Sequence, residues 1–202
     1  MLKKGLLLAV TVGCLTVMAS KARILPAPQK SGGMSLTEAL SKRHTVRRFQ
    51  KTELTPQQLA DILWSANGIN RSNGKRTAPS AMDKRDVMIF AAMSDGVWYY
   101  DPELHLAKNQ MGRVSREDVR KYCGKFAAPC YLILVPDRKK QKREVFAALD
   151  VGYVSQNIYL AAQAHGLGTC AMGSIVDRKK LIEILNLGEN VPVLVHPVGI
   201  PE

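Results

Sequence analysis

One long apolar helix limits the folds open to this chain more than any other segment. The pattern predicts it from about residue 142 to residue 165, and Gly166 is a usual residue at which a helix ends. Its centre reads Asp150-Val151-Gly152-Tyr153 and is apolar or small on more than one face. Such a helix is buried on several sides, so we expect it to form the spine of one domain. A chain of 202 residues, 46% of them hydrophobic, is long enough for that core.

Strands and shorter helices are predicted on both sides of this segment. Residues 130–135 are apolar at consecutive positions, which indicates a strand buried on both faces. Further strands are expected over residues 86–93, 96–106, 167–172 and 191–198, and helix starts at Ser35, Thr55, Ser115 and Asp177. Because strands and helices alternate irregularly, we expect an α+β fold: a three-layer α-β-α sandwich with a mainly antiparallel sheet.

The first 20 residues are typical of a secretory signal peptide. Lys3 and Lys4 precede an uncharged apolar run over residues 5–19, which is shorter than the roughly 20 apolar residues of a membrane span. An uncleaved N-terminal anchor, or a lipid on Cys14, is the alternative. We therefore expect an exported, periplasmic protein that contacts a membrane only if its N-terminus is uncleaved or lipidated.

The next segment separates the signal peptide from the domain. Residues 21–33 carry two prolines, two glycines and scattered charges, which is typical of an extended linker. The sequence therefore divides into a signal peptide (1–20), a linker (21–33) and a single domain (34–202).

The chain is basic, with a formal net charge of +12. Its lysines and arginines are spread over many segments, with few aromatic residues among them and no helix-turn-helix or zinc-finger spacing. We therefore expect a solvated cationic surface and a phosphate-binding pocket, and no nucleic-acid partner.

Three cysteines follow the signal segment: Cys123, Cys130 and Cys170. Their number is odd and no CxxC pair occurs, so a metal site, which needs about four converging ligands, is not expected. A disulfide between Cys123 and Cys130 and a buried thiol at Cys130 are both open.

The residues best suited to hold a ligand follow the first short helix. They read Arg43-His44-Thr45-Val46-Arg47-Arg48-Phe49, with three guanidinium groups and a hydroxyl that can grip an anion. In extended chain, Arg43, Thr45 and Arg47 would share one side. From spacing alone, a solvated basic patch is the alternative. A second candidate is the long loop over residues 67–81, since such loops are more often functional than idle.

Four segments, in order, resemble the nitroreductase-type FMN proteins. They are the Arg43–Phe49 run, the loop over 66–81, the Asp150-x-Gly-x-x-x-Gln156-Asn157 helix, and the turn over 166–174. The loop, with its Lys75-Arg76-Thr77-Ala78-Pro79-Ser80-Ala81 end, is similar to that of the SagB-like dehydrogenase subgroup. The GxGxxG, GxxxxGK[ST], HExxH and GxSxG signatures do not occur.

The resemblance implies a site for FMN between two identical subunits. Arg43 would hold the phosphate with His44 and Thr45, and Arg47 would lie near flavin N1/O2. Pro79, Ser80 and Ala81 would come from the partner subunit, and the backbone around Met172 and Gly173 would offer an N–H toward N5. No side chain need act as acid or base, because the cofactor carries the chemistry.

The implied activity is hydride transfer from NAD(P)H to a small-molecule acceptor, such as a nitro or quinone-like compound. Two alternatives remain. One is an exported flavin-binding relative without reductase turnover, since NAD(P)H is scarce outside the cytoplasm and relatives often carry further basic residues in a C-terminal segment. The other is a SagB-like dehydrogenase that acts on a modified peptide. The homodimer interface would rest largely on the central helix.

Overall fold

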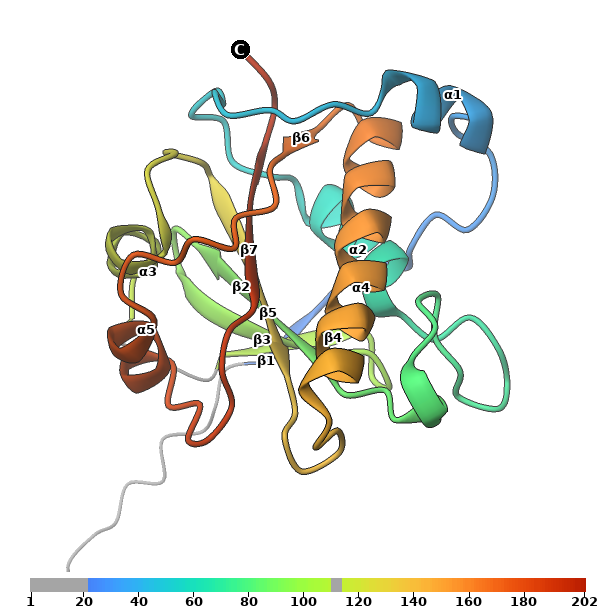
Figure 1. Cartoon of the computed structure of the whole chain (residues 1–202). Coiled ribbons are helices and arrows are strands. Elements are labelled where there is room, and N and C mark those ends of the chain that lie inside the picture. Colours follow the sequence, from blue (N-terminus) through green and yellow to red (C-terminus); the bar gives the residue numbers. More distant parts are fainter. Residues whose placement is uncertain (1–21, 110–113) are drawn as a thin grey trace, which may run out of the picture.

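A computed structural model describes residues 22–109 and 114–202, so the predicted signal peptide lies outside the described residues. Its sheet has seven strands in the order β1-β4-β3-β2-β5-β7-β6, and every neighbouring pair is antiparallel (Figure 1). The strands are β1 (Ala22–Ile24), β2 (Val87–Met93), β3 (Gly96–Asp101), β4 (Leu106–Asn109), β5 (Cys130–Pro136), β6 (Gly168–Thr169) and β7 (Leu194–Gly199). This confirms the antiparallel sheet.

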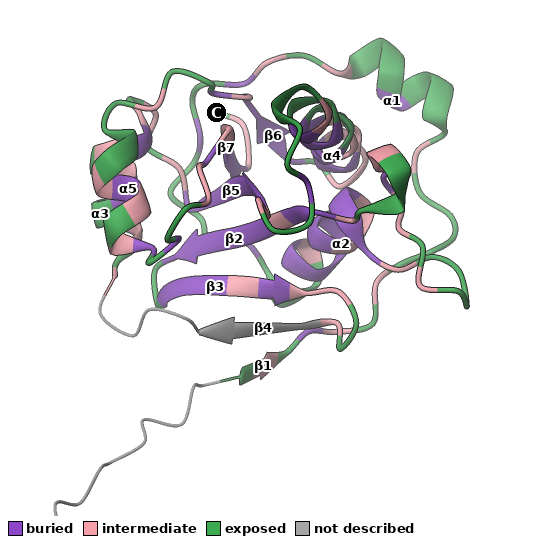
Figure 2. Cartoon of the chain, turned by 60° about the horizontal axis from the view of Figure 1, so that its bottom comes forward, coloured by how far each residue is buried: buried purple, intermediate pink, exposed green. Residues whose placement is uncertain are grey.

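Helices cover both faces of the sheet. They are α1 (Leu36–Lys42), α2 (Pro56–Asn67), α3 (Arg116–Cys123), α4 (Glu144–Ala164) and α5 (Arg178–Ile184), with the 3-10 turn η1 (Ala81–Asp83). Alternate residues of β2 point to opposite sides: Ile89 packs with α2 and α4, whereas Phe90 packs with α3 and α5. The two cores lie on either side of fully buried strands (Figure 2), so the three-layer sandwich is confirmed.

Side-chain caps explain where the helices begin. Thr55 and Gln58 close a capping box at α2, and Ser115 with Asp118 closes another at α3. At α1, Ser35 accepts the Glu38 N–H, whereas the Glu38 carboxylate pairs with Lys42 instead of returning to the cap. These contacts satisfy backbone N–H groups that have no partner within their own helix.

The segment predicted to be a linker is, from Ala22 on, part of the domain. Strand β1 pairs with β4, Leu25 is buried in the core, and the Gln29 N–H donates to the buried Asp61 carboxylate. The prolines and glycines of this segment therefore mark an extended chain that is tied to the sheet edge, and the domain begins before residue 34.

Two further sequence expectations are decided by the structure. The strand predicted over 96–106 is two strands, because the Asp101 carboxylate accepts the N–H groups of Glu103 and Leu104 and turns the chain. Cys123 and Cys130 are both free and buried, so of the two open alternatives the structure has the buried thiol at Cys130. Within residues 22–109 and 114–202, no helix is long and apolar enough to cross a membrane.

Candidate functional site

The arginine-rich segment runs extended from the end of α1 along the edge of the sheet. Arg43 is the C-cap residue of α1, where the helix ends. The Val46 N–H donates to the Thr169 carbonyl (2.9 Å), and the Gln50 N–H donates to the Ile200 carbonyl (2.9 Å). Backbone bonds at both ends therefore fix which side chains of the segment face inward and which face solvent.

Tyr159 of α4 gathers the candidate phosphate ligands. The Arg43 guanidinium lies 5.3 Å from the centre of the Tyr159 ring, and the Thr45 hydroxyl lies 3.4 Å from the Tyr159 hydroxyl. The same hydroxyl accepts the Ala171 N–H at 2.8 Å. Arg43 is half-buried and forms no ion pair with any described residue. The Tyr159 ring therefore holds the Arg43 guanidinium in place, and its positive charge remains available to an anion.

His44 takes a different direction from Arg43. Its Nδ1 lies 2.8 Å from the Lys42 carbonyl, and the side chain is exposed. It borders a cavity of about 160 Å³ on the other side of the segment, lined among others by His44, Val46, Tyr159, Gly168, Thr169 and Pro201. Ligand pockets usually measure about 300–1,000 Å³, so this cavity alone is too small for a flavin.

Arg47 reaches the strand that follows α4. It is exposed and lies beside Cys170, whose pKa is raised by burial in spite of the opposing effect of the Arg47 charge. Residues 172 and 173 follow within about 7–10 Å of chain. The structure therefore places Arg43, Thr45 and Arg47 along one segment beside the turn that follows Cys170.

Of the two predicted backbone donors at this turn, Met172 and Gly173, one is already paired. The Met172 N–H donates to the Val195 carbonyl (2.9 Å), its own carbonyl accepts the Val195 N–H (3.0 Å), and the residue is buried. The Gly173 amide is exposed and makes no hydrogen bond with a described residue. The expectation of an N–H from Met172 or Gly173 therefore narrows to Gly173, because pairing with Val195 occupies both backbone groups of Met172.

The second group of predicted residues is Pro79, Ser80 and Ala81. It lies against a different part of α4 from Arg43. The Ala81 N–H donates to the Asp150 carboxylate (2.8 Å). Asp150 precedes Tyr159 by nine residues, which is about 13 Å along a helix. Within one chain the 79–81 segment and Arg43 therefore contact positions of α4 that are about 13 Å apart.

Two buried carboxyl groups lie next to the 79–81 segment, and one of them accepts the Ala81 N–H. Asp86 and Asp150 are both fully buried. Burial, followed by the contact with Asp150, raises the pKa of Asp86 to about 7. Sequence reasoning missed this pair, because Asp86 precedes a strand and Asp150 lies within a helix, and only the fold brings them together.

A second buried network, also missed from the sequence, joins α4 to β6 and β7. His196 contacts the Ser155 hydroxyl (2.9 Å) and the Thr169 hydroxyl (3.0 Å), and Thr169 donates to the Pro197 carbonyl (2.8 Å). Thr169 must then accept from Nδ1–H, which assigns the tautomer. Burial lowers the His196 pKa to about 3, so this histidine is neutral and structural.

Comparisons with known proteins return nitroreductases. A sequence profile of the nitroreductase family matches residues 40–200. A Methanocaldococcus jannaschii protein named as a nitroreductase is 31% identical over 185 residues, covering 82% of this chain and 91% of that protein. A Methanothermobacter thermautotrophicus protein named as an NADH dehydrogenase/NAD(P)H nitroreductase is 28% identical, covering 85% and 80%. A Ralstonia eutropha crystal structure, named likewise as a nitroreductase, has a TM-score of 0.84 and 31% identity, covering 98% and 96%.

Proposed function

The chain belongs to the nitroreductase family of oxidoreductases, and we propose that it binds FMN and transfers hydride from NAD(P)H to a nitro- or quinone-like acceptor. The observation that carries the proposal is Arg43. Its guanidinium is held on the Tyr159 ring beside the Thr45 hydroxyl, and no described acidic residue neutralises it. A cation that is positioned but unpaired suits a phosphate.

The residues present fit a flavin. Arg43 and Thr45 would hold its phosphate, with His44 approaching from the other side of the segment. Arg47 would place a positive charge near N1/O2, and the Gly173 amide is the donor that could reach N5. When bound, FMN supplies the hydride chemistry by accepting two electrons from NAD(P)H and passing them to the acceptor. The chain itself would bind and orient FMN and tune its potential, and no side chain is assigned as acid or base.

Tyr159 has a positioning role in this scheme. Its ring supports the Arg43 guanidinium, while its hydroxyl accepts the Ala171 N–H at the start of the turn that carries Gly173. One side chain thereby fixes the spacing between the phosphate end and the ring end of the site.

We also propose that the protein is a homodimer in which α4 packs on its counterpart. Among large apolar side chains, Val145, Leu149 and Tyr153 of α4 are 70%, 49% and 46% exposed, and Leu36 and Leu40 of α1 are 64% and 52% exposed. The three α4 residues are spaced four apart and so form one stripe. An apolar stripe of this kind is typical of a surface that a partner covers.

The dimer would complete the site by bringing Pro79, Ser80 and Ala81, which contact α4 about 13 Å from Arg43 in the same chain, against a second copy. We propose that they lie against the flavin held by the partner. The test is complementation between two variants, Arg43→Ala and Ser80→Leu, each of which should bind little FMN as a homodimer.

Co-expression of the two variants gives the decisive result. A heterodimer has one site with both changes and one site with neither, so flavin absorbance should return in the mixed sample. No recovery in confirmed heterodimers would show that Arg43 and Ser80 do not meet across subunits.

Turnover separates the remaining alternatives. Purified protein should be yellow and should oxidise NADH or NADPH with a nitroaromatic acceptor. Colourless protein that does not take up FMN would refute the proposal, whereas FMN-loaded protein without turnover would favour a flavin-binding carrier. Assignment to the SagB-like subgroup rests on the 66–81 loop, and export rests on residues 1–20. Mass determination of the mature N-terminus would test export.

A further inference from the structure

The loop between α2 and the 79–81 segment carries cations that the proposed flavin site does not use. Arg71, Lys75 and Arg76 lie within six residues, and Lys84 and Arg85 follow η1. Among them, Arg85 is paired with Asp83 through two contacts of 2.9 and 2.7 Å. The loop therefore presents more positive charge than its own acidic residue can neutralise.

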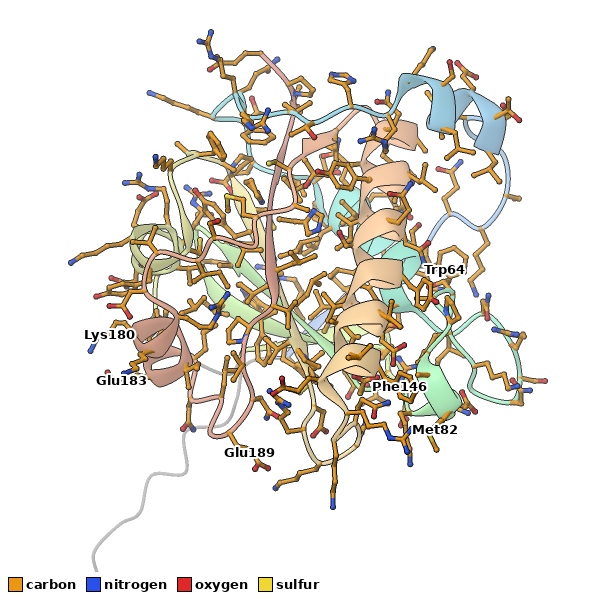
Figure 3. All side chains as sticks on the ribbon, in the orientation of Figure 1. Trp64, Met82, Phe146, Lys180, Glu183 and Glu189 are labelled. Atoms are coloured by element: carbon orange, nitrogen blue, oxygen red, sulfur yellow. The ribbon has the colours of Figure 1, made fainter. Side chains whose placement is uncertain are left out.

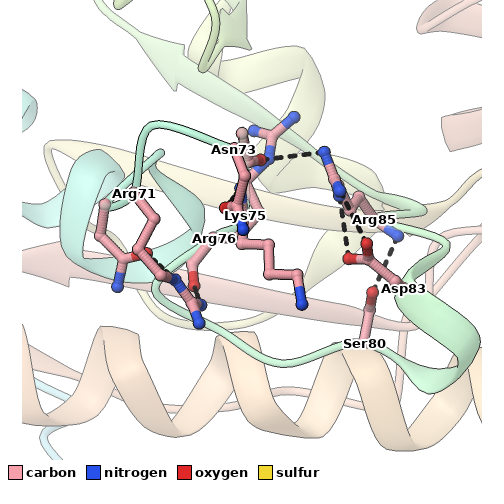
Figure 4. Close-up of polar contacts among 9 residues, drawn as sticks. Arg71, Asn73, Lys75, Arg76, Ser80, Asp83 and Arg85 are labelled. Atoms are coloured by element: carbon pink, nitrogen blue, oxygen red, sulfur yellow. Dashed lines mark hydrogen bonds and ion pairs between the residues drawn. The ribbon is translucent and has the colours of Figure 1, made fainter.

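Arg85 fastens this loop to the 79–81 segment. Its guanidinium donates to the Gly74 carbonyl (3.1 Å) and to Asp83, while its backbone N–H donates to the Ser80 hydroxyl (2.8 Å) (Figure 4). The side chains of Arg71 and Lys75 extend toward the same side of the loop as Ser80 (Figure 4). Ser80 and these two cations therefore belong to one loop region that Arg85 holds together.

Neither Arg71 nor Lys75 is committed to an acidic partner among the described residues. The Arg71 guanidinium donates to two neutral oxygens, the Asn70 side-chain carbonyl (3.0 Å) and the Arg76 backbone carbonyl (2.9 Å). Lys75 is exposed, and its ammonium lowers the pKa of Asp83 only as a minor contributor after Arg85. Their charge is thus presented to solvent on a loop that hydrogen bonds hold in place.

Arg76 holds the base of the loop with part of its donor capacity unused. Its Nη1 donates to the Asn67 carbonyl (3.2 Å), and its buried Nε has no partner among the described residues. Burial lowers the Arg76 pKa, against the raising effect of Tyr100 and Glu103. A buried donor without a partner is uncommon and adds to the electropositive character of this edge.

The backbone under these cations is strained. Met82, Asp83 and Arg85 have φ values of 57°, 54° and 49°, in the left-handed region that residues with a side chain rarely adopt. Residues in this conformation cluster at functional sites. The contacts of Asp150 with Ala81 and of Arg85 with Gly74 maintain this conformation.

We propose that residues 70–76, together with Arg85, form an anion-binding rim, and that the molecule reacting at the partner's flavin carries a carboxylate or phosphate group that this rim selects. The inference rests on the proposed function, because it is the flavin that brings a reactant next to Ser80. The group could belong to the acceptor or be the 2′-phosphate of NADPH, and both have the charge and oxygen geometry that arginine binds.

The test compares pairs of similar reagents, of which one carries an additional anionic group. In FMN-loaded enzyme, KM would be measured for 4-nitrobenzoate and for neutral 4-nitrobenzyl alcohol, and for NADPH and NADH. The variants are Arg71→Gln and Lys75→Gln, which spare the contacts of Arg85. Lys180→Gln is the control, because it removes one surface lysine charge, paired with Glu183, from α5 on the far side of the molecule from Met82 (Figure 3).

Each rim variant should raise KM for the anionic reagent roughly tenfold, the loss expected for one hydrogen bond to a charged group. The reagent that lacks the extra anionic group, 4-nitrobenzyl alcohol or NADH, should be unaffected, and added salt should reduce the difference. A change confined to 4-nitrobenzoate assigns the anion to the acceptor, and a change confined to NADPH assigns it to the hydride donor. Control enzyme should match wild type.

Binding supplies a second measurement that does not need turnover. Titration of the flavin spectrum with 4-nitrobenzoate should give a Kd that rises by the same factor in the rim variants. The rim proposal alone would be refuted if the variants had normal FMN content and turnover and also had wild-type KM and Kd values for the reagents with and without the anionic group. Wild-type protein that takes up no FMN would overturn the proposed function, and the rim with it.

Discussion

The buried carboxyl pair makes stability depend on pH in a way that one substitution should remove. Asp86 and Asp150 lie together with no exposed surface, and one Asp150 oxygen is already used by the Ala81 N–H. The other oxygen has no partner unless Asp86 is protonated and donates to it. Asp86→Asn replaces that O–H with an N–H that cannot be lost.

The size of the effect follows from the pKa. The Asp86 carboxyl titrates near 3.8 when unperturbed and near 7 in the folded protein, so the folded state binds the proton more tightly. Its contribution to the free energy of unfolding is full below pH 3.8 and is lost as pH rises through about 7. Between pH 5 and pH 8 the loss is about 2–3 kcal/mol.

Urea unfolding at pH 5 and pH 8 measures this directly. Between pH 5 and pH 8, the free energy of unfolding of Asp86→Asn should rise by about 2–3 kcal/mol relative to that of wild type. Glu189→Gln is the control: its carboxylate is exposed, and the change should stay within about 0.5 kcal/mol at both pH values. If the free energies of unfolding of wild type and Asp86→Asn differed by the same amount at pH 5 and at pH 8, a proton shared between Asp86 and Asp150 would be refuted.

Three other substitutions test the site and its support. Arg43→Ala should weaken FMN binding by about 1.5–3 kcal/mol in an equilibrium flavin titration, whereas Arg48→Ala, which removes an exposed neighbouring charge, should leave it unchanged. Tyr159→Phe keeps the ring but leaves a backbone N–H without its acceptor, so thermal unfolding should show a loss of about 1–3 kcal/mol, and an unchanged Tm would contradict the bond. Gly168→Ala would place a Cβ 2.7 Å from the Val46 side chain and should cost about 1–3 kcal/mol in chemical denaturation; a neutral result would mean that the segment over 43–49 can move away.

Local chemistry accounts for the parts of the fold that could be predicted. The caps at Ser35, Thr55, Ser115 and Asp177 act within three residues, so the sequence alone locates the helix starts. The consecutive apolar run at the start of β5 likewise follows from burial on both faces.

The failures come from interactions that act across the fold. The segment before residue 34 resembled a linker because Pro and Gly mark extended chain, and pairing with β4, far along the sequence, decides that it belongs to the sheet. Strand 96–106 was predicted as continuous because the turn at Asp101 was overlooked. The role of Tyr159 was missed for a related reason, since a tyrosine within an apolar helix is usual in a core.

The segment over residues 43–50 also seals one side of the sheet. Strand β6 is two residues long and would otherwise leave backbone groups open, but Val46 bonds to Thr169, and Phe49 bridges to Pro201. Exposed sheet edges promote aggregation. The inward side chains of the segment must therefore keep it packed on the sheet, whereas its outward side chains can serve ligand binding. Deep mutational scanning should therefore separate two phenotypes along seven residues: soluble protein without flavin at Arg43 and Arg47, and insoluble protein at Val46 and Phe49.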